Sequence, residues 1–376
     1  MARVVLITGV SGYLGAEVAA ILRDEPGIER LIEVAGPATA DTASRPRPRA
    51  AEAASGDWPQ QAAGQAARPD EEVVRLDVRT NQLGELIKAT AADTVVHLGL
   101  ATTPGAAGGR ASMKETNVVG AMQLLIACQR SPTVRKLVVR SSTAVYGTSA
   151  RNPTVFTEDM EPRASHGLAR DVVDVEGYVR GLARRRPDIA VSVLRFVNFL
   201  GHRVDSPLTR YFMLPVTPTV LGHDPRIQFV DLWDGVEVVR RVVAHDHPGI
   251  FNVTGRGAMY LSQCLRRGGR VPVPMPGPAL DAIAGLGFFP DVSPEQRDLL
   301  RYGRVVDGTK LERELGWAPR RTTEEAFAAF VADRGLTCSR PVAAADGALA
   351  AALDALRPAD DAHQAQASPY SEGAPI

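Results

Sequence analysis

The chain has 376 residues and a mass of 40.1 kDa, which predicts two structural units or one large unit with additions. Its 43 Lys and Arg residues balance 43 Asp and Glu residues, so we expect neither a nucleic acid nor a membrane as partner. The three cysteines, Cys128, Cys264 and Cys338, lack Cys-x-x-Cys spacing, which argues against a disulfide framework and against a zinc knuckle.

The N-terminal segment enters a β-branched run directly after Arg3, without the core of a signal peptide. No apolar stretch approaches the roughly 18 residues that a membrane span needs. We therefore expect a cytoplasmic protein in a reducing compartment.

Short β-type runs alternate with longer helix-period segments over the first 197 residues, as in parallel βαβ units. Helices are expected over 114–130 and 168–184. The pattern predicts an α/β, Rossmann-type domain over residues 1–197 with a doubly wound parallel sheet. Its six predicted strands cover residues 3–8, 30–35, 72–76, 94–98, 135–140 and 190–195.

Pro-rich turns follow Asn198, with short strands expected near 227–230 and 250–253 and helices near 234–244 and 323–333. We expect a smaller capping domain over 198–336, which would bind the substrate. Residues 36–70 have a low-complexity composition that predicts a disordered insertion, and a scarcity of large apolar side chains predicts a disordered tail over 337–376.

A glycine-rich segment lies between the first strand and the first helix. Gly9 permits a tight turn, Gly12 lets the backbone approach a pyrophosphate, and Gly15 allows the helix to pack closely on the strand. The helix N-terminus offers N–H groups to the anion. The segment therefore predicts a dinucleotide-binding turn formed by Gly9, Ser11, Gly12, Tyr13, Leu14 and Gly15.

This Gly-x-x-Gly-x-x-Gly spacing resembles the extended short-chain dehydrogenase/reductases, the nucleotide-sugar epimerase/dehydratase family typified by UDP-glucose 4-epimerase. Around 171–180 the chain is most similar to actinobacterial members. Further segments that resemble family motifs are Leu76-Asp77-Val78, His97-Leu98-Gly99-Leu100, Asn117, Ser141-Ser142-Thr143-Ala144-Val145-Tyr146-Gly147, Leu194-Arg195-Phe196-Val197-Asn198 and Leu315-Gly316-Trp317.

The resemblance implies an NAD- or NADP-binding protein that acts on a small molecule such as a nucleotide sugar, with a homodimer as one possible assembly. It implies that Ser142 bonds a substrate hydroxyl. Besides the turn, the implied cofactor contacts are Asp77, Val78, Leu98, Gly99, Asn117 and Val197, and residues expected to bind an anionic substrate are Asn198, Arg203, Arg226 and Arg301. From their settings we expect His97, Tyr146 and Trp317 to be packed side chains and Asn117 to tie loop backbone together.

Ala35 departs from the family pattern at the end of the second strand. A carboxylate expected there would accept hydrogen bonds from the adenosine ribose, and a methyl group cannot. Glu33 lies deeper in the strand, while the arginines that begin at Arg45 could meet a 2′-phosphate. NAD and NADP therefore both stay open as the cofactor.

Leu168 and Val172 occupy the positions of the family's catalytic Tyr and Lys when the chain is aligned on 176–178. Neither side chain can hold or move a proton. A register shifted by two residues gives His166-x-x-x-Arg170, in which imidazole would be the acid/base and guanidinium would hold the ribose. Tyr178 is about 15 Å farther along the helix and too remote to replace the tyrosine.

Two hypotheses of function follow. The chain is an enzyme that transiently oxidises a sugar or related alcohol, using Ser142 and His166, or a pseudoenzyme that keeps the dinucleotide fold for binding or regulation. Asp231 and Asp234 could form a metal pair, but we expect a helix N-cap. Hydrolase, zincin and P-loop motifs are absent from the sequence.

Overall fold

The computed structural model describes residues 3–36, 70–104, 107–164, 166–285 and 293–336. Seven parallel strands form a large sheet in the order β11-β6-β5-β4-β1-β2-β3. These strands are β1 (Val4–Thr8), β2 (Arg30–Ala35), β3 (Asp70–Arg75), β4 (Thr94–His97), β5 (Lys136–Ser142), β6 (Ala190–Phe196) and β11 (Gly249–Val253). The strand order reverses between β1 and β4, which opens a crevice at their carboxyl ends.

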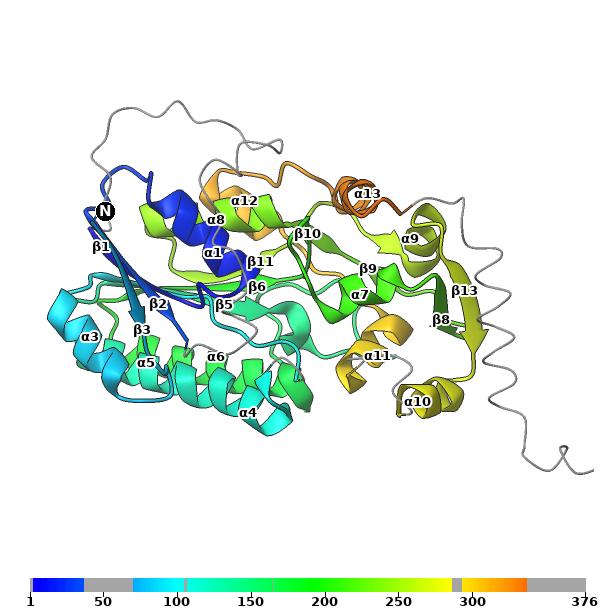
Figure 1. Cartoon of the computed structure of the whole chain (residues 1–376), viewed down its shortest axis with the longest axis horizontal. Coiled ribbons are helices and arrows are strands. Elements are labelled where there is room, and N and C mark those ends of the chain that lie inside the picture. The colour runs from blue at the N-terminus through cyan, green and yellow to red at the C-terminus, as the bar shows by residue number, and fades with distance from the viewer. Residues whose placement is uncertain (1–2, 37–69, 105–106, 165, 286–292, 337–376) are drawn as a thin grey trace, which may run out of the picture.

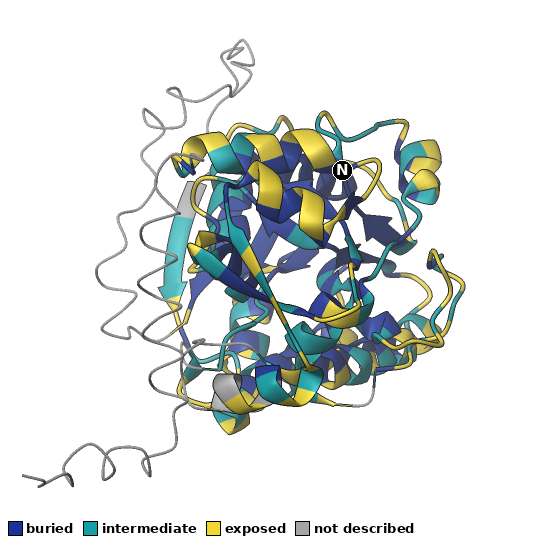
Figure 2. Cartoon of the chain, turned by 90° about the vertical axis from the view of Figure 1, so that its right-hand side faces the viewer, coloured by how far each residue is buried: buried dark blue, intermediate teal, exposed yellow. Residues whose placement is uncertain are grey.

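Helices cover both faces of this sheet (Figure 1). One face carries α1 (Tyr13–Leu22), α8 (Leu232–Ala244) and α12 (Thr309–Leu315), and the other carries α3 (Gln82–Thr90), α5 (Gly120–Arg130) and α6 (Gly167–Arg185). Because both faces are covered, the central strands are apolar runs, and Val5, Leu6 and Ile7 of β1 are fully buried. Figure 2 shows the buried strands inside and the exposed outer surfaces of the helices.

The remaining elements form a smaller layer beside the carboxyl ends of the strands (Figure 1). Three two-stranded ladders pair β7 (Asn198–Leu200) with β10 (Phe229–Asp231), β9 (Arg226–Ile227) with β12 (Met259–Tyr260), and β8 (Val216–Val220) with β13 (Val271–Met275). Phe212, Phe229, Phe327 and Phe330 pack together as their aromatic core. The helices here are α7 (Pro207–Met213), α9 (Leu261–Arg267), α10 (Gly277–Gly285), α11 (Pro294–Tyr302) and α13 (Thr323–Asp333).

The structure confirms the six predicted strands to within two residues at each end, but the large sheet has a seventh strand. The strand expected near 250–253 is β11, which pairs in parallel with β6 instead of belonging only to a cap. Phe251 and Val253 are fully buried in the same core cluster as α8. The chain after residue 197 thus contributes to both layers, and the division into domains at that residue stays a prediction.

The expected helix over 114–130 is three consecutive segments: α4 (Arg110–Lys114), a π-helical turn (Glu115–Val119) and α5. The expected helix over 168–184 is α6, and those near 234–244 and 323–333 are α8 and α13. Of the insertion predicted over residues 36–70, residues 37–69 lie outside the described residues, whereas Gly36 is described and Asp70 begins β3. The predicted tail over 337–376 also lies outside the described residues.

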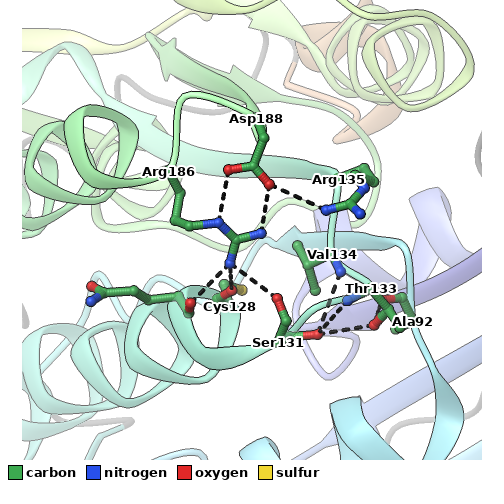
Figure 3. Close-up of polar contacts among 9 residues, drawn as sticks. Ala92, Cys128, Ser131, Thr133, Val134, Arg135, Arg186 and Asp188 are labelled. Atoms are coloured by element: carbon green, nitrogen blue, oxygen red, sulfur yellow. Dashed lines mark hydrogen bonds and ion pairs between the residues drawn. The ribbon is translucent and has the colours of Figure 1, made fainter.

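Arg186 ties the ends of α5 and α6 together at the amino edge of the sheet (Figure 3). Its guanidinium donates hydrogen bonds to the carbonyl oxygens of Cys128, Gln129 and Ser131, which α5 leaves without helical partners. Asp188 accepts from the same guanidinium at 2.8 and 2.7 Å, and these hydrogen bonds lower the pKa of Asp188 to about 2. This cluster lies at the opposite edge from the crevice and has a structural role.

Candidate cofactor and substrate site

The glycine turn lies at the carboxyl end of β1. A Cβ on Gly9, where φ is +84°, would lie 2.3 Å from Gly99 N, and one on Gly15 would lie 2.2 Å from Gly9 O, so neither position admits a side chain. A Cβ on Gly12 would meet only Gly9 O, at 3.4 Å. Gly12 is the N-cap of α1 and no side chain caps this helix, so its first N–H groups can bind an anion. The turn therefore fits a pyrophosphate.

The loop beside this turn is held by buried polar side chains. His97 Nδ1 lies 2.7 Å from Thr8 Oγ1, and burial, followed by the charge of Arg140, lowers the pKa of His97 to about 4. Asn117 accepts from Ala101 N at 2.8 Å and donates to Ala101 O at 2.9 Å. Both expectations are confirmed: His97 is a packed, neutral side chain, and Asn117 ties loop backbone together.

Asp77 follows β3 and is held by Arg79. The guanidinium Nε donates to Asp77 Oδ1 at 2.9 Å and Nη2 donates to Oδ2 at 2.7 Å, and these bonds lower the pKa of Asp77. The Val78 side chain packs closely on Gly120. A Cβ added at Gly120 would lie 2.9 Å from Val78 Cγ2. The contacts of Asp77, Val78, Leu98 and Val197 with a cofactor stay predictions.

Ala35 is the last residue of β2 and is paired with Arg75 of the neighbouring strand β3. The Glu33 carboxylate accepts a hydrogen bond from Arg23 of the segment after α1 at 2.6 Å, and its side chain is buried. Glu33 is therefore engaged inside the fold and does not replace the missing ribose carboxylate. The arginines that begin at Arg45 lie outside the described residues.

A cavity of about 360 Å³ adjoins the turn, between the carboxyl ends of β5 and β6 and the smaller layer. One side is lined by Tyr13 of the turn, by Ser142 at the end of β5, and by Val197 and Asn198, which follow the end of β6. Residues of α7 and α11 line the other side: Pro207, Leu208, Glu295, Gln296, Asp298 and Leu299.

Four arginines give this cavity a positive character: Arg140, Arg151, Arg163 and Arg304. Arg304 is half-buried and donates to Thr148 Oγ1 at 3.2 Å. Burial lowers the pKa of Arg304 to about 10, which still leaves it charged at neutral pH. Within the described part of the chain no carboxylate forms an ion pair with Arg304. The cavity therefore suits a ligand with an anionic group.

Ser142 and His166 both reach the cavity. Ser142 ends β5, and its Oγ accepts a hydrogen bond from Ala144 N at 3.2 Å. His166 is the N-cap residue of α6, its side chain is 55% exposed, and its Nε2 lies 3.7 Å from Asp298 Oδ2. The structure thus places a hydroxyl, an imidazole and a carboxylate around one cavity, with the imidazole beside the carboxylate.

The rest of the expected catalytic helix is apolar or remote. Leu168 lines the cavity, whereas Val172 is 2% exposed and lies in the core. Arg170 pairs with Asp174 at 3.0 Å and does not line the cavity, so only His166 of the shifted pair reaches it. Tyr178 is 43% exposed and also lies away from the cavity.

Among the residues expected to bind substrate, Asn198 lines the cavity. Arg203 lies 3.4 Å from Glu17, Arg226 donates to Thr154 O, and Arg301 stacks on Tyr302, and none of these three arginines lines it. Their part in substrate binding stays a prediction.

Sequence reasoning missed the four cavity arginines. Arg140 carried a signal, because a charged residue interrupts the apolar run of β5 immediately before Ser141. Arg163 and Arg304 lie in irregular segments where an arginine is usually exposed, so no signal distinguished them.

Asp231 and Asp234 serve structure. Asp231 caps α8 by accepting from Trp233 N at 2.9 Å, which confirms the expected N-cap. Asp234 accepts from Arg320 N and Arg321 N, while burial raises its pKa to about 6. The part of the chain that the structure describes holds no group of three His, Cys, Asp or Glu side chains arranged for a metal. In the same residues, no helix combines the length and the apolar character that crossing a bilayer requires.

The doubly wound sheet, with a glycine turn at its switch point, defines a Rossmann-type nucleotide-binding fold. The model of the NAD-dependent epimerase/dehydratase family matches residues 5–254, from β1 to just beyond β11. The chain belongs to this family. Uncharacterized proteins of Mycobacterium tuberculosis and Mycobacterium bovis are 40% identical to it over 340 residues, which are 89% of this chain and 85% of each relative.

Three solved structures share the fold, each covering 88% of this chain. MoeE5 in complex with UDP-glucuronic acid and NAD has a TM-score of 0.63 at 19% identity, over 99% of its own length. UDP-glucose 4-epimerase with UDP-glucose from Thermotoga maritima has a TM-score of 0.63 at 16% identity, over 98%. DesIV, a dTDP-glucose 4,6-dehydratase from Streptomyces venezuelae with NAD bound, has a TM-score of 0.63 at 20% identity, over 96%.

Proposed function

We propose that the chain binds a nicotinamide dinucleotide at the glycine turn and oxidises, transiently, an alcohol of a nucleotide sugar or related anionic substrate held in the adjoining cavity. One observation carries the proposal: Tyr13 of the turn, Ser142, His166 and Arg304 all line a single cavity. The neighbouring structures that hold both NAD and a UDP-sugar support the choice of ligands.

The chain's own residues take distinct roles in this proposal. Ser142 bonds the reacting hydroxyl, and His166, with Asp298 beside its imidazole, accepts the hydroxyl proton. Arg163 and Arg304 bind the substrate's anionic group. The bound dinucleotide supplies the hydride acceptor.

A second candidate is a binding or regulatory module without turnover. Leu168 in the cavity wall and Val172 in the core favour it, because these positions hold neither a proton-transfer group nor a cation.

We also propose a cytoplasmic location and a small-molecule partner. A reducing compartment suits a chain whose three cysteines lack the spacing of a disulfide framework. We further propose that the protein forms a homodimer. Sedimentation of the purified protein measures its oligomeric state.

The two candidates separate in one experiment. UDP-glucose or UDP-glucuronic acid is mixed rapidly with the protein and a stoichiometric amount of NAD⁺, and the absorbance of the transiently formed, bound reduced nicotinamide is followed over the first turnover. The enzyme forms reduced nicotinamide, His166→Ala loses it, and His245→Ala, at an exposed site outside the cavity, retains it. Binding of NAD⁺ and UDP-sugar without reduction supports the module, and failure to bind NAD⁺ contradicts both.

A further inference from the structure

Arg140 is a charged side chain at the carboxyl end of a buried strand. In β5 it follows Leu137, Val138 and Val139, which are at most 1% exposed, and it lines the cavity. Its Nη2 donates to Tyr13 Oη at 3.0 Å, and its Nη1 lies 3.4 Å from Leu98 O. The guanidinium carbon lies 5.4 Å from the centroid of the Tyr13 ring and 5.6 Å from that of the Phe199 ring.

All of these partners are uncharged. A phenol, a backbone carbonyl and two aromatic rings surround the guanidinium, and no carboxylate among the described residues forms an ion pair with Arg140. Cation–π contacts and hydrogen bonds orient the group without neutralising it. Two hydrogen bonds also use only part of a guanidinium's five N–H donors. Arg140 therefore presents an oriented positive charge to the cavity.

The strand order places Arg140 relative to the crevice. The glycine turn follows β1, and the adenosine side of a dinucleotide lies over the end of β2, where Ala35 stands. The other half of the dinucleotide must then extend over β4 and β5. Arg140 and Ser142 lie two residues apart in β5, so they project from the same side of the strand at that end.

We propose that Arg140 holds the nicotinamide riboside half of the dinucleotide and supplies there the cation that buried Val172 cannot provide. The inference rests on the proposed dinucleotide site and deepens it. It makes Arg140 a positioning and specificity residue that donates hydrogen bonds to the ribose. It also has an electrostatic consequence: a nearby positive charge disfavours the cationic oxidised nicotinamide relative to the neutral reduced ring.

Calorimetric titration of the full chain with NADH, NAD⁺ and AMP tests the proposal. Arg140→Met, which removes the charge and keeps most of the length, should weaken NADH binding by about tenfold or more. Arg140→Lys should retain most of the affinity. AMP binding should not change, because AMP lacks the nicotinamide half. Arg135→Met, on the exposed segment before the same strand, is the matched control and should bind NADH like the wild type.

The ratio of the NADH affinity to the NAD⁺ affinity provides a readout that a structural role would not move. In Arg140→Met this ratio should fall by about fivefold or more, since the charge that disfavours NAD⁺ is gone. Melting curves establish that each variant is folded, and Arg140→Gln is the second neutral variant if the methionine variant is not.

Several results would overturn the inference. NADH binding to the neutral variants that equals or exceeds the wild-type affinity would mean that Arg140 is uninvolved or obstructs the crevice. An equal loss of AMP affinity and NADH affinity would mean that Arg140 does not bind the nicotinamide half of the dinucleotide. Wild-type protein that binds none of the three ligands would remove the proposed function itself, whereas wild-type binding with an unaffected Arg140→Met removes this inference alone.

Discussion

Glu176 of α6 accepts two hydrogen bonds from Arg195 of β6, from Nε at 2.9 Å and from Nη2 at 2.7 Å, and each side chain is 1% exposed. Ser141 Oγ donates to Glu176 Oε1, and Arg195 Nη1 donates to Tyr146 Oη, which in turn donates to Asn252 in β11. The pair therefore joins α6 to three strands, beside the place where Ser142 ends β5.

Glu176→Gln should lower the free energy of unfolding by about 3–5 kcal/mol, because it leaves the Arg195 charge buried without its counter-charge. Urea unfolding measures the change. Glu324→Gln removes an exposed partner of Arg267 and should stay within about 0.5 kcal/mol of the wild type. Similar losses for both variants would show that burial of the pair does not set its contribution.

His97 should make stability depend on pH. Burial and the charge of Arg140 lower its pKa from 6.5 to about 4, so between these values the unfolded state binds more protons than the folded state. The contribution of neutral His97 to the free energy of unfolding is fully present above pH 6.5 and declines as the pH falls towards 4. The loss should be about 2 kcal/mol between pH 7 and pH 5.

Urea midpoints at these two pH values, for the wild type and His97→Asn, measure this contribution. The asparagine variant should lack that part of the pH dependence, and His245→Gln, at an exposed position, should retain it. Equal pH dependence in the wild type and His97→Asn would mean that His97 titrates normally in the folded protein.

The three glycines of the turn should separate binding from folding. Gly12→Val should abolish dinucleotide binding with little loss of stability, because a Cβ at Gly12 meets only one protein atom and the valine side chain would fill the proposed pyrophosphate site. Gly15→Ala should destabilise the fold, since its Cβ would lie 2.2 Å from Gly9 O. Calorimetry with NADH and thermal melting measure the two effects. Unchanged NADH affinity in Gly12→Val would remove the turn from the site.

Ala35→Asp should strengthen NAD⁺ binding and weaken NADP⁺ binding, because the new carboxylate can accept hydrogen bonds from the ribose hydroxyls and repels a 2′-phosphate. Glu33 cannot compensate in the wild type, since Arg23 engages it. Competition titrations of the two cofactors measure the change. If neither affinity moves, the adenosine ribose is held elsewhere.

The six strands could be predicted from the sequence because a parallel strand that is buried on both faces appears as a short, continuous apolar run rich in β-branched residues. The sequence did not predict that β11 belongs to the large sheet, because the residues of a five-residue strand do not indicate which strand it pairs with. Its partner, β6, lies more than fifty residues earlier in the chain. The glycine turn was recognisable because backbone geometry there admits no Cβ at Gly9 or Gly15.

The cavity was only partly predictable. Ser142 and Asn198 belong to motifs at strand ends, where topology dictates their position. Glu295 and Asp298 reach the cavity from α11, more than 120 residues after His166, and nothing local in the sequence indicates that approach. The role of Arg140 could not be predicted from its position, because it depends on the uncharged groups around the guanidinium and on the lack of an ion-paired carboxylate among the described residues.

A crystal structure of the full chain with NADH bound would show directly whether the dinucleotide lies in the proposed site. We expect the pyrophosphate against Gly12 at the start of α1, with the nicotinamide riboside beside Arg140 and its ring facing Ser142 and the cavity. A dinucleotide bound away from the turn, or one whose nicotinamide points away from the cavity, would contradict it.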